Sequence, residues 1–302
     1  MSAANLNTFH AGQTGNRVDS HTVLYCVIGD PIQHSKSPVM MNRAFRETGL
    51  NGIYTAFHIT GEQLPDFITG VRAMGIRGIN VTIPHKLAVM PLLDEIDESA
   101  QAIGAVNTIV NNNGRLVGYN TDGIGYVRSL KEEAEPDLSG KRILVVGAGG
   151  ATRGILYALA REGVSSITIA NRTVARAEEM AAAFEGQAEG LRLHAIGHEG
   201  LKKACGDADI VINTTSLGMH PKVDETPADA GWLVPGTIAS DLIYNPMTTR
   251  FLAEAKQQGC KIHSGLGMFI YQGAYAFEFW TGQEAPVEAM RSAVLEAFRT
   301  GR

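Results

Sequence analysis

The chain has 302 residues, of which 44% are hydrophobic, and this is enough for one large domain or two of ordinary size. Its 26 basic and 31 acidic residues give a formal net charge of −5, so the chain as a whole offers no electrostatic attraction to nucleic acid or to an anionic membrane. The three cysteines, Cys26, Cys205 and Cys260, lie far apart and lack the spacing of a zinc site. We therefore expect reduced thiols in a cytoplasmic protein that holds no metal.

The first 22 residues are polar and contain no apolar stretch of the kind that a secretory signal needs. No run of 18 apolar residues occurs later in the chain. We interpret residues 1–22 as a flexible tail that precedes a protein without a membrane span.

From Val23 onward, short β-rich runs alternate with helical patterns, which is typical of an α/β fold. Strands are predicted at 23–29, 53–60 and 78–84, and helices at 37–49 and 62–75. Two further β-rich runs, at 105–110 and 115–120, flank an Asn-Gly step that predicts a hairpin turn. The polar stretch KEEAEPDLSG, residues 131–140, is by composition the candidate domain junction.

A second α/β series follows that stretch and begins with the apolar strand in KRILVVGAGG. Further strands are predicted at 166–170, 191–196, 208–214 and 237–243. Two helices, at 267–282 and 286–298, close the chain without intervening strands. These helices either complete the second domain or return to cover the first.

In RILVVGAGGATRGILYALA, a glycine-rich turn lies between an apolar strand and an amphipathic helix. Gly147 permits the tight turn, and Gly149 lets the backbone approach a pyrophosphate, whose negative charge the N–H groups of the following helix face. The third position of the pattern, usually glycine, is Thr152. This context predicts a dinucleotide-binding domain, although an ordinary strand-to-helix connection can also be rich in glycine.

The stretch SITIANRTVAR bears on the choice between NAD and NADP. A carboxylate that holds the ribose hydroxyls of NAD is usual near the end of this strand, and Asn171 and Arg172 stand there instead. Arg172, Thr173 and Arg176 can bind a 2′-phosphate, so we predict NADP. The alternative is that Thr173 caps a helix and the arginines are solvated, although cations at a helix N-terminus cost about 0.3–1 kcal/mol each.

The first half of the chain offers polar groups for chemistry. Ser35 and Ser37 precede a predicted helix that has Pro38 at its first position. Two hydroxyls at a helix N-terminus suit a carboxylate ligand, and Ser37 is also well suited to capping the helix.

The stretch GINVTIPHK places Ile79, Val81 and Ile83 on one face of a predicted strand. Lys86 follows just past the end of that strand, where ligands bind in open α/β sheets. Asp122 stands between the hairpin and the next helix. Taken singly, Lys86 can be a solvated surface charge and Asp122 a helix cap.

Together, eight stretches resemble the shikimate dehydrogenase family. These are GDPIQHSKSP, NVTIPHK, GAVNTIV, GYNTDG, GAGGATRG, NRTVARA, TTSLGM and GLGMFIYQGA, in this order and at similar spacing. The resemblance implies reversible, NADP-dependent reduction of 3-dehydroshikimate to shikimate, on the pathway to chorismate and the aromatic amino acids. It also implies an α/β substrate-binding domain, 23–121 plus 263–302, and an inserted Rossmann-type NADP-binding domain, 122–262.

The resemblance further implies roles for single residues. Lys86 and Asp122 match the catalytic pair, in which Lys86 donates the proton and Asp122 orients it. The residues that match substrate contacts are Ser35, Ser37, Thr82, Asn107, Tyr244 and Gln272. The residues that match cofactor contacts are Gly147, Ala148, Gly149, Gly150, Ala151, Asn171, Arg172, Thr173, Arg176, Leu242 and Gly265.

Relatives that use quinate or prefer NAD share most of these stretches, so a quinate/shikimate dehydrogenase with relaxed substrate or cofactor use is one alternative. A non-catalytic NADP-binding regulator is another. The serines of HSKS, the threonine of NVT and the arginines of NRTVAR favour the NADP-linked shikimate type, and the presence of Lys86 and Asp122 disfavours the regulator. We expect a small-molecule substrate and neither nucleic acid nor membrane as partner. A homodimer is compatible with the sequence, in which no contact surface can be identified.

Overall fold

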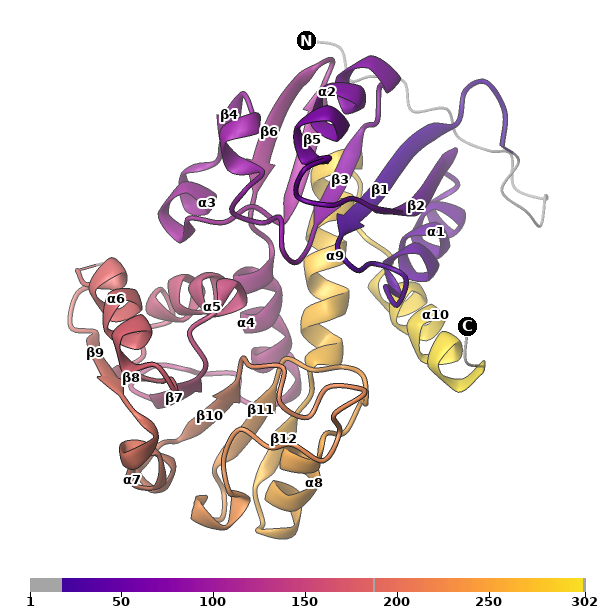
Figure 1. Cartoon of the computed structure of the whole chain (residues 1–302). Coiled ribbons are helices and arrows are strands. Elements are labelled where there is room, and N and C mark those ends of the chain that lie inside the picture. The colour runs from indigo at the N-terminus through magenta and orange to yellow at the C-terminus, as the bar shows by residue number, and fades with distance from the viewer. Residues whose placement is uncertain (1–17, 187, 301–302) are drawn as a thin grey trace. The chain divides into compact units, whose positions relative to one another are not determined.

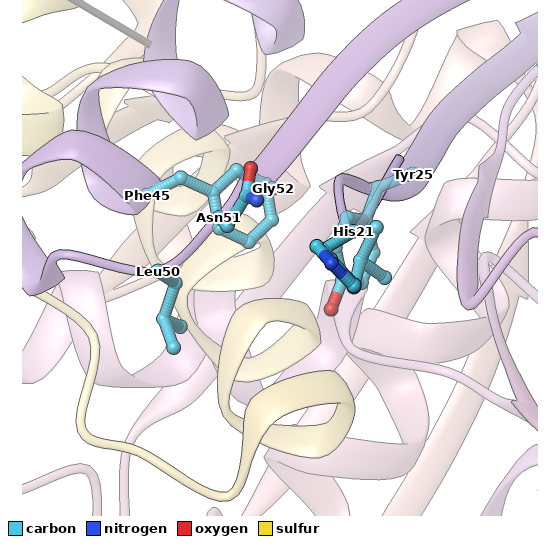
Figure 2. A pocket seen from close by; sticks show the side chains of 7 residues that line it. His21, Tyr25, Phe45, Leu50, Asn51 and Gly52 are labelled. Carbon is cyan, nitrogen blue, oxygen red and sulfur yellow. The ribbon is translucent and has the colours of Figure 1, made fainter. Parts of the chain in front are cut away.

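A computed structural model describes residues 18–186 and 188–300 (Figure 1). Most of the tail predicted at 1–22 lies outside these residues. Its last part, from Asp19 to Thr22, forms a turn that is hydrogen bonded to Asn51. A small cavity beside this turn has a volume of about 10 Å³ and is lined by His21, Phe45 and neighbouring side chains (Figure 2). That volume is at the lower limit for one water molecule, so this cavity is no ligand site.

The chain divides into two compact units. Unit 1 consists of the residues up to Thr121 together with those from Gln272 onward, and unit 2 spans Asp122–Tyr271. The second division falls inside helix α9 (Gly265–Thr281). The polar stretch at 131–140 lies within unit 2, so its prediction as the domain junction is wrong. The reason is that helix α4 (Asp122–Glu133), which leads into it, packs against α5 (Gly150–Ala160) of the same unit.

Unit 1 is built on a six-stranded sheet of order β2-β1-β3-β5-β6-β4, in which β5 runs antiparallel to both of its neighbours. The strands are β1 (Val23–Gly29), β2 (Gly52–His58), β3 (Gly78–Val81), β4 (Glu95–Ile96), β5 (Thr108–Asn112) and β6 (Arg115–Tyr119). The helices are α1 (Ser37–Thr48), α2 (Leu64–Met74), α3 (Glu98–Ile103), the last part of α9 and α10 (Val287–Thr300). Helices α1 and α10 pack against each other (Figure 1).

Two local details of unit 1 test the sequence patterns. The predicted hairpin is confirmed between β5 and β6, where Asn113 and Gly114 both have positive φ, 54° and 95°, as a mirror-image turn requires. The place of Ile83 on one face of the strand with Ile79 and Val81 was predicted wrongly, because β3 ends at Val81. The Ile83 side chain lies in the turn beyond it and is 73% exposed.

The C-terminal part of α9 is anchored to the sheet of unit 1 by Trp280. Its indole Nε1 donates to the Ile109 carbonyl at 2.9 Å, and its ring lies 5.3 Å from the ring of Tyr25. Such a buried aromatic contributes both apolar area and a directional hydrogen bond. The helix that carries Gln272 is therefore fixed relative to β1 and β5.

Unit 2 is built on six parallel strands of order β12-β11-β10-β7-β8-β9. The strands are β7 (Arg142–Val146), β8 (Ser166–Ala170), β9 (Arg192–Ile196), β10 (Ile210–Asn213), β11 (Ile238–Asp241) and β12 (Lys261–His263). The remaining helices are α6 (Val174–Phe184), α7 (Leu201–Asp207) and α8 (Arg250–Gln257). The strand order reverses between β7 and β10, and ligands of such doubly wound sheets bind at the carboxyl ends beside this reversal.

Apolar side chains cover both faces of this sheet. Residues of α4, α5 and α6 pack with Ile143, Ile167 and Ile212 on one face, and residues of α7 and α8 pack with Leu144 and Val211 on the other. Strands buried on both faces read as continuous apolar runs, which is why ILVV and IVI were recognisable in the sequence. The predicted two-domain α/β fold class is confirmed.

Candidate functional site

In unit 2, a cavity of about 490 Å³ lies at the carboxyl ends of the strands. Five residues of the predicted cofactor site line it: Gly147, Asn171, Arg172, Thr173 and Arg176. The other lining residues are Val146, Ala170, His198, Leu201, Thr215, Ser216, Leu217, Thr226 and Pro227. The structure thus brings the glycine-rich turn and the arginine-bearing segment to one cavity.

The glycine-rich turn explains why threonine can replace the third glycine. The buried Thr152 hydroxyl accepts a hydrogen bond from the Gly149 N–H at 3.1 Å and lies 2.8 Å from the Thr214 hydroxyl. Gly147 has φ 119°, and a Cβ there would lie 2.5 Å from the Thr214 Oγ1. Thr152 therefore fixes the turn, and Gly147 must remain glycine on both counts.

A Cβ at Gly149 or Gly150 would meet no atom within 4 Å, so open space faces both residues at the start of α5. Backbone N–H groups at a helix N-terminus bind phosphate groups, and the helix dipole favours their negative charge. The turn thus has the form that a pyrophosphate requires.

The segment after β8 presents cationic side chains to the same cavity. Asn171 is fixed by a hydrogen bond from its Nδ2 to the Thr173 carbonyl at 2.8 Å. Thr173 occupies the N-cap position of α6, but its hydroxyl makes no capping hydrogen bond. Arg172 and Arg176 are exposed, and within 18–186 and 188–300 neither guanidinium forms an ion pair. Capping therefore does not account for this group, whereas an anionic ligand would.

Sequence reasoning missed His198 and the segment from Thr215 to Leu217 as lining residues. His198 follows β9, and Thr215 follows β10. Their positions after strands were a usable signal, since the carboxyl ends of parallel strands share one edge of a sheet. Using it requires the strand order, which no local pattern contains.

In unit 1, a chain of polar contacts links several of the predicted substrate-binding residues. The Ser37 N–H donates to the Ser35 Oγ at 3.3 Å, and the Ser37 side chain is hydrogen bonded to Tyr54. Burial raises the pKa of Tyr54 well above its usual range, and its hydroxyl donates to the Asn80 Oδ1 at 2.6 Å. Asn80 in turn donates to the Thr108 Oγ1 at 3.2 Å.

The same chain of contacts continues to Asn107 and Gln272. Asn107, which is buried, donates from Nδ2 to the Thr121 Oγ1 at 3.0 Å and accepts from the Thr121 N–H at 2.8 Å. The Thr121 hydroxyl donates to the Gln272 carbonyl at 3.0 Å. Two predicted substrate-binding residues that lie far apart in the sequence are therefore joined through one threonine.

Thr82 and Lys86 lie in the turn region that follows β3 and are both half-buried. The backbone holds this region in place, because the Thr82 N–H donates to the Ile28 carbonyl at 3.0 Å and the Val106 N–H to the Lys86 carbonyl at 2.9 Å. Asp122 is buried at the first turn of α4 and is the first residue of unit 2.

The remaining predicted residues lie after β11. Tyr244 stacks on Phe269 with ring centroids 4.5 Å apart, and burial raises the pKa of its hydroxyl. The Gly265 N–H donates to the Ile243 carbonyl at 3.2 Å, and a Cβ on Gly265 would lie 2.0 Å from the Leu242 carbonyl oxygen. Leu242 and Gly265 are thus in close backbone contact within unit 2.

Within the two described ranges, no group of three or more His, Cys, Asp or Glu residues could hold a metal ion. No helix in the described part of the chain is long and apolar enough to cross a bilayer. The three cysteines are buried and form no disulfide.

Comparison with known proteins identifies the family. Residues 27–109 match the model for the shikimate dehydrogenase substrate binding domain, 129–223 that for shikimate/quinate 5-dehydrogenase, and 265–295 that for the shikimate 5'-dehydrogenase C-terminal domain. The chain is 51% identical to the NADP(+) shikimate dehydrogenase of Geobacillus kaustophilus, over 91% of this chain and 99% of that protein. The chain belongs to the shikimate dehydrogenase family.

Solved structures agree with this assignment. A shikimate dehydrogenase in complex with NADP+ is 43% identical, with a TM-score of 0.88 over 94% of this chain and 99% of that one. The enzyme of Thermus thermophilus, solved with NADP(H) and shikimate, is 37% identical, with a TM-score of 0.81 over 91% of this chain and 100% of that one. The predicted family is confirmed, and the fold of this member extends over nearly the whole length of its relatives.

Proposed function

We propose that this chain catalyses the reversible, NADP-dependent reduction of 3-dehydroshikimate to shikimate, a step of aromatic amino acid biosynthesis. One observation carries the proposal: the nearly full-length match, at about half of all positions, to a curated enzyme of that name. The cavity of unit 2 and the polar contacts of unit 1 support it, because they supply groups of the type that each ligand needs.

On the substrate side, Ser35 and Ser37 are the proposed contacts of the carboxylate. Ser35 lies just before α1 and Ser37 is its first residue, where backbone N–H groups add a partial positive charge. Thr82, Asn107, Gln272 and Tyr244 are the proposed contacts of the other polar groups of the ring. The hydrogen bonds that Asn107 and Gln272 share with Thr121 support this role, since they restrict the Asn107 side chain and the Gln272 backbone.

For the chemistry, bound NADPH would supply the hydride. Lys86 is the proposed donor of the proton that the developing alkoxide needs, and Asp122 is proposed to orient and balance the Lys86 ammonium. The choice is supported by the fixed backbone on both sides of the lysine. In the reverse direction, Lys86 must lose its proton before it can accept one from the substrate hydroxyl.

For the cofactor, Gly147 to Ala151 are the proposed contacts of the pyrophosphate, and Asn171, Arg172, Thr173 and Arg176 those of the 2′-phosphate. Leu242 and Gly265 are the proposed backbone contacts of the nicotinamide. Two observations support this fit: the open space at Gly149 and Gly150, and the presence of Arg172 and Arg176 at the cavity that Gly147 lines.

The test is the shikimate-dependent formation of NADPH by the purified protein, with NAD+ and quinate as parallel alternatives. A general acid–base residue contributes about 10²–10⁴-fold, so we expect kcat to fall by that factor in Lys86→Ala and by less in Asp122→Asn. Lys202→Ala, which removes an exposed lysine of α7, is the matched control. A nearly normal kcat in Lys86→Ala would rule out the proton-donor role.

Two finer features are also proposed. A cytoplasmic location is supported by three buried cysteines without a disulfide. Fractionation of cells that produce the protein would test it. A homodimer stays a prediction, which light scattering of the purified protein would decide.

A further inference from the structure

A buried pair of polar side chains joins the last residues of two neighbouring strands of unit 2. Asn213 ends β10, Asp241 ends β11, and the two are direct partners in the parallel register. Both are 0% exposed. The Asn213 Nδ2 donates to the Asp241 Oδ1 at 3.1 Å. Neither residue lines the cavity of unit 2, and neither has a role in the function proposed above.

Asn213 holds the loop that follows β10. Its Oδ1 accepts from the Thr215 N–H at 3.0 Å and from the Thr215 hydroxyl at 2.7 Å. Its Nδ2 also donates to the Leu217 carbonyl at 3.1 Å. Thr215 and Leu217 line the cavity, so one amide side chain makes three of the hydrogen bonds that hold this wall.

Asp241 holds the loop that follows β11. Its Oδ1 accepts from the Ile243 N–H at 2.9 Å, and its Oδ2 accepts from the Thr249 hydroxyl at 2.8 Å. The backbone adds one further link, since the Leu242 N–H donates to the Asn213 carbonyl at 3.1 Å. The loop that carries Leu242 is therefore tied to the same two side chains.

A buried carboxylate in this place is costly for the fold. Burial raises the pKa of Asp241 from 3.8 to about 6, although the hydrogen bonds from Ile243, Thr249 and Asn213 oppose the rise. A neutral side chain would avoid the desolvation cost. The carboxylate offers what a neutral group lacks, namely two oxygens that accept three donors at once.

We propose that Asn213 and Asp241 act as a positioning pair, which holds the Thr215–Leu217 loop and the Leu242–Ile243 loop in one fixed arrangement for NADP. The proposal rests on the function proposed above, in which Leu242 contacts the nicotinamide. The pair touches neither substrate nor cofactor and acts through the two loops. Its loss raises the KM and Kd for NADP and leaves the KM for shikimate unchanged.

The variants are chosen to separate positioning from stability. Asp241→Ala and Asn213→Ala should each weaken NADP+ binding about tenfold, the factor for one lost hydrogen bond of ~1.4 kcal/mol. Asp241→Asn keeps an oxygen for the Ile243 N–H and an N–H2 group that can donate to Thr249, so it should restore the Kd to within about twofold of the wild type. Thr249→Val is the matched control, because it removes the Thr249 hydrogen bond to the same carboxylate and the cap of α8, but keeps the bonds of the pair to Thr215, Leu217 and Ile243.

The readouts are the Kd for NADP+ from a fluorescence titration, the two KM values, kcat and the Tm. Positioning predicts that Thr249→Val lowers the Tm and keeps the Kd, whereas Asp241→Ala changes both. Unchanged Kd and KM for NADP+ in folded Asp241→Ala and Asn213→Ala would overturn the proposal. If the wild type binds NADP+ but shows no turnover of shikimate, the proposed function fails, while the Kd series still tests the pair.

Hydrogen exchange of the wild type tests the pair without any substitution. The amides of Thr215 and Ile243 each donate to one member of the pair. If the pair holds both loops, the two amides should become exposed to exchange in a single opening of the structure. Their protection factors should then be equal and should rise by the same factor on addition of NADP+. Clearly different opening free energies for the two amides would overturn the proposal.

Discussion

Arg172 and Arg176 provide the sharpest test of cofactor choice, through the substitutions Arg172→Ala and Arg176→Ala. Both guanidinium groups are exposed beside the cavity of unit 2 and form no ion pair with any carboxylate in the described ranges. No internal partner has to be given up when a 2′-phosphate binds. The free energy of the charge-assisted hydrogen bond therefore contributes to binding without the loss of an internal ion pair.

The magnitude follows from this exposure. Hydrogen bonds to charged groups contribute about 1.5–3 kcal/mol, and solvent screening at an exposed site favours the lower end. Each substitution should therefore raise the KM for NADP+ about tenfold and leave the KM for NAD+ nearly unchanged. Added salt should narrow the difference between the wild type and the variants, because it weakens the same interaction.

The assay is the initial rate of shikimate oxidation at varied NADP+ or NAD+, at low and high ionic strength. Arg192→Ala serves as the control, since Arg192 is an exposed arginine of β9 that does not line the cavity. An equal loss with NADP+ and NAD+ would refute the reasoning, because NAD+ has no 2′-phosphate. An unchanged KM for NADP+ in both variants would refute it as well.

Three further predictions concern the framework of unit 2. Thr152→Val should lower the free energy of unfolding by about 1–3 kcal/mol in urea titrations, since it removes a buried hydroxyl that is hydrogen bonded to the Gly149 N–H, the Gly147 carbonyl and the Thr214 hydroxyl. An unchanged free energy of unfolding would contradict the role of this hydroxyl. In Gly265→Ala, the added Cβ would lie 2.0 Å from the Leu242 carbonyl oxygen. This substitution should lower the free energy of unfolding by about 1–3 kcal/mol and raise the KM for NADP+. Burial raises the pKa of Asp241 to about 6 and lowers that of His263 to about 4. As the pH falls below 6.5, protonation of Asp241 in the folded state therefore increases stability, whereas protonation of His263 in the unfolded state decreases it. Asp241→Asn should therefore lose stability more steeply than the wild type between pH 6.5 and 4, and an equal slope in urea titrations would contradict this.

Local pattern was sufficient for most elements of secondary structure. Strands β1 and β8 begin and end where the apolar runs VLYCVIG and SITIA do. The hairpin turn was predictable because only a few residue types adopt positive φ without strain. Strand β12, with three residues, was missed because so short a run carries no periodicity.

The predictable part of the site lies in contiguous segments. The glycine-rich turn and the NRTVAR segment each carry their chemistry within a few residues, so a single stretch was enough to propose their ligands. His198 could not be found in this way, because it is an ordinary polar residue in its local context. The stretch TTSLGM, which contains Thr215, resembles the family but gives no local sign of a ligand. Their place at the cavity follows from the order of β8, β9 and β10 in the sheet.

The sequence by itself determined the α/β class, the dinucleotide-binding turn and the positive charge beside it, since these depend on periodicity, backbone freedom and residue type within short windows. Only the tertiary structure decided which distant polar groups meet. Asn213 and Asp241 are 28 positions apart, and their hydrogen bond exists because the parallel register of β10 and β11 sets their last residues side by side in a dry interior. Such a pair leaves no local pattern, because the energy of a buried hydrogen bond depends on a partner that strand pairing supplies.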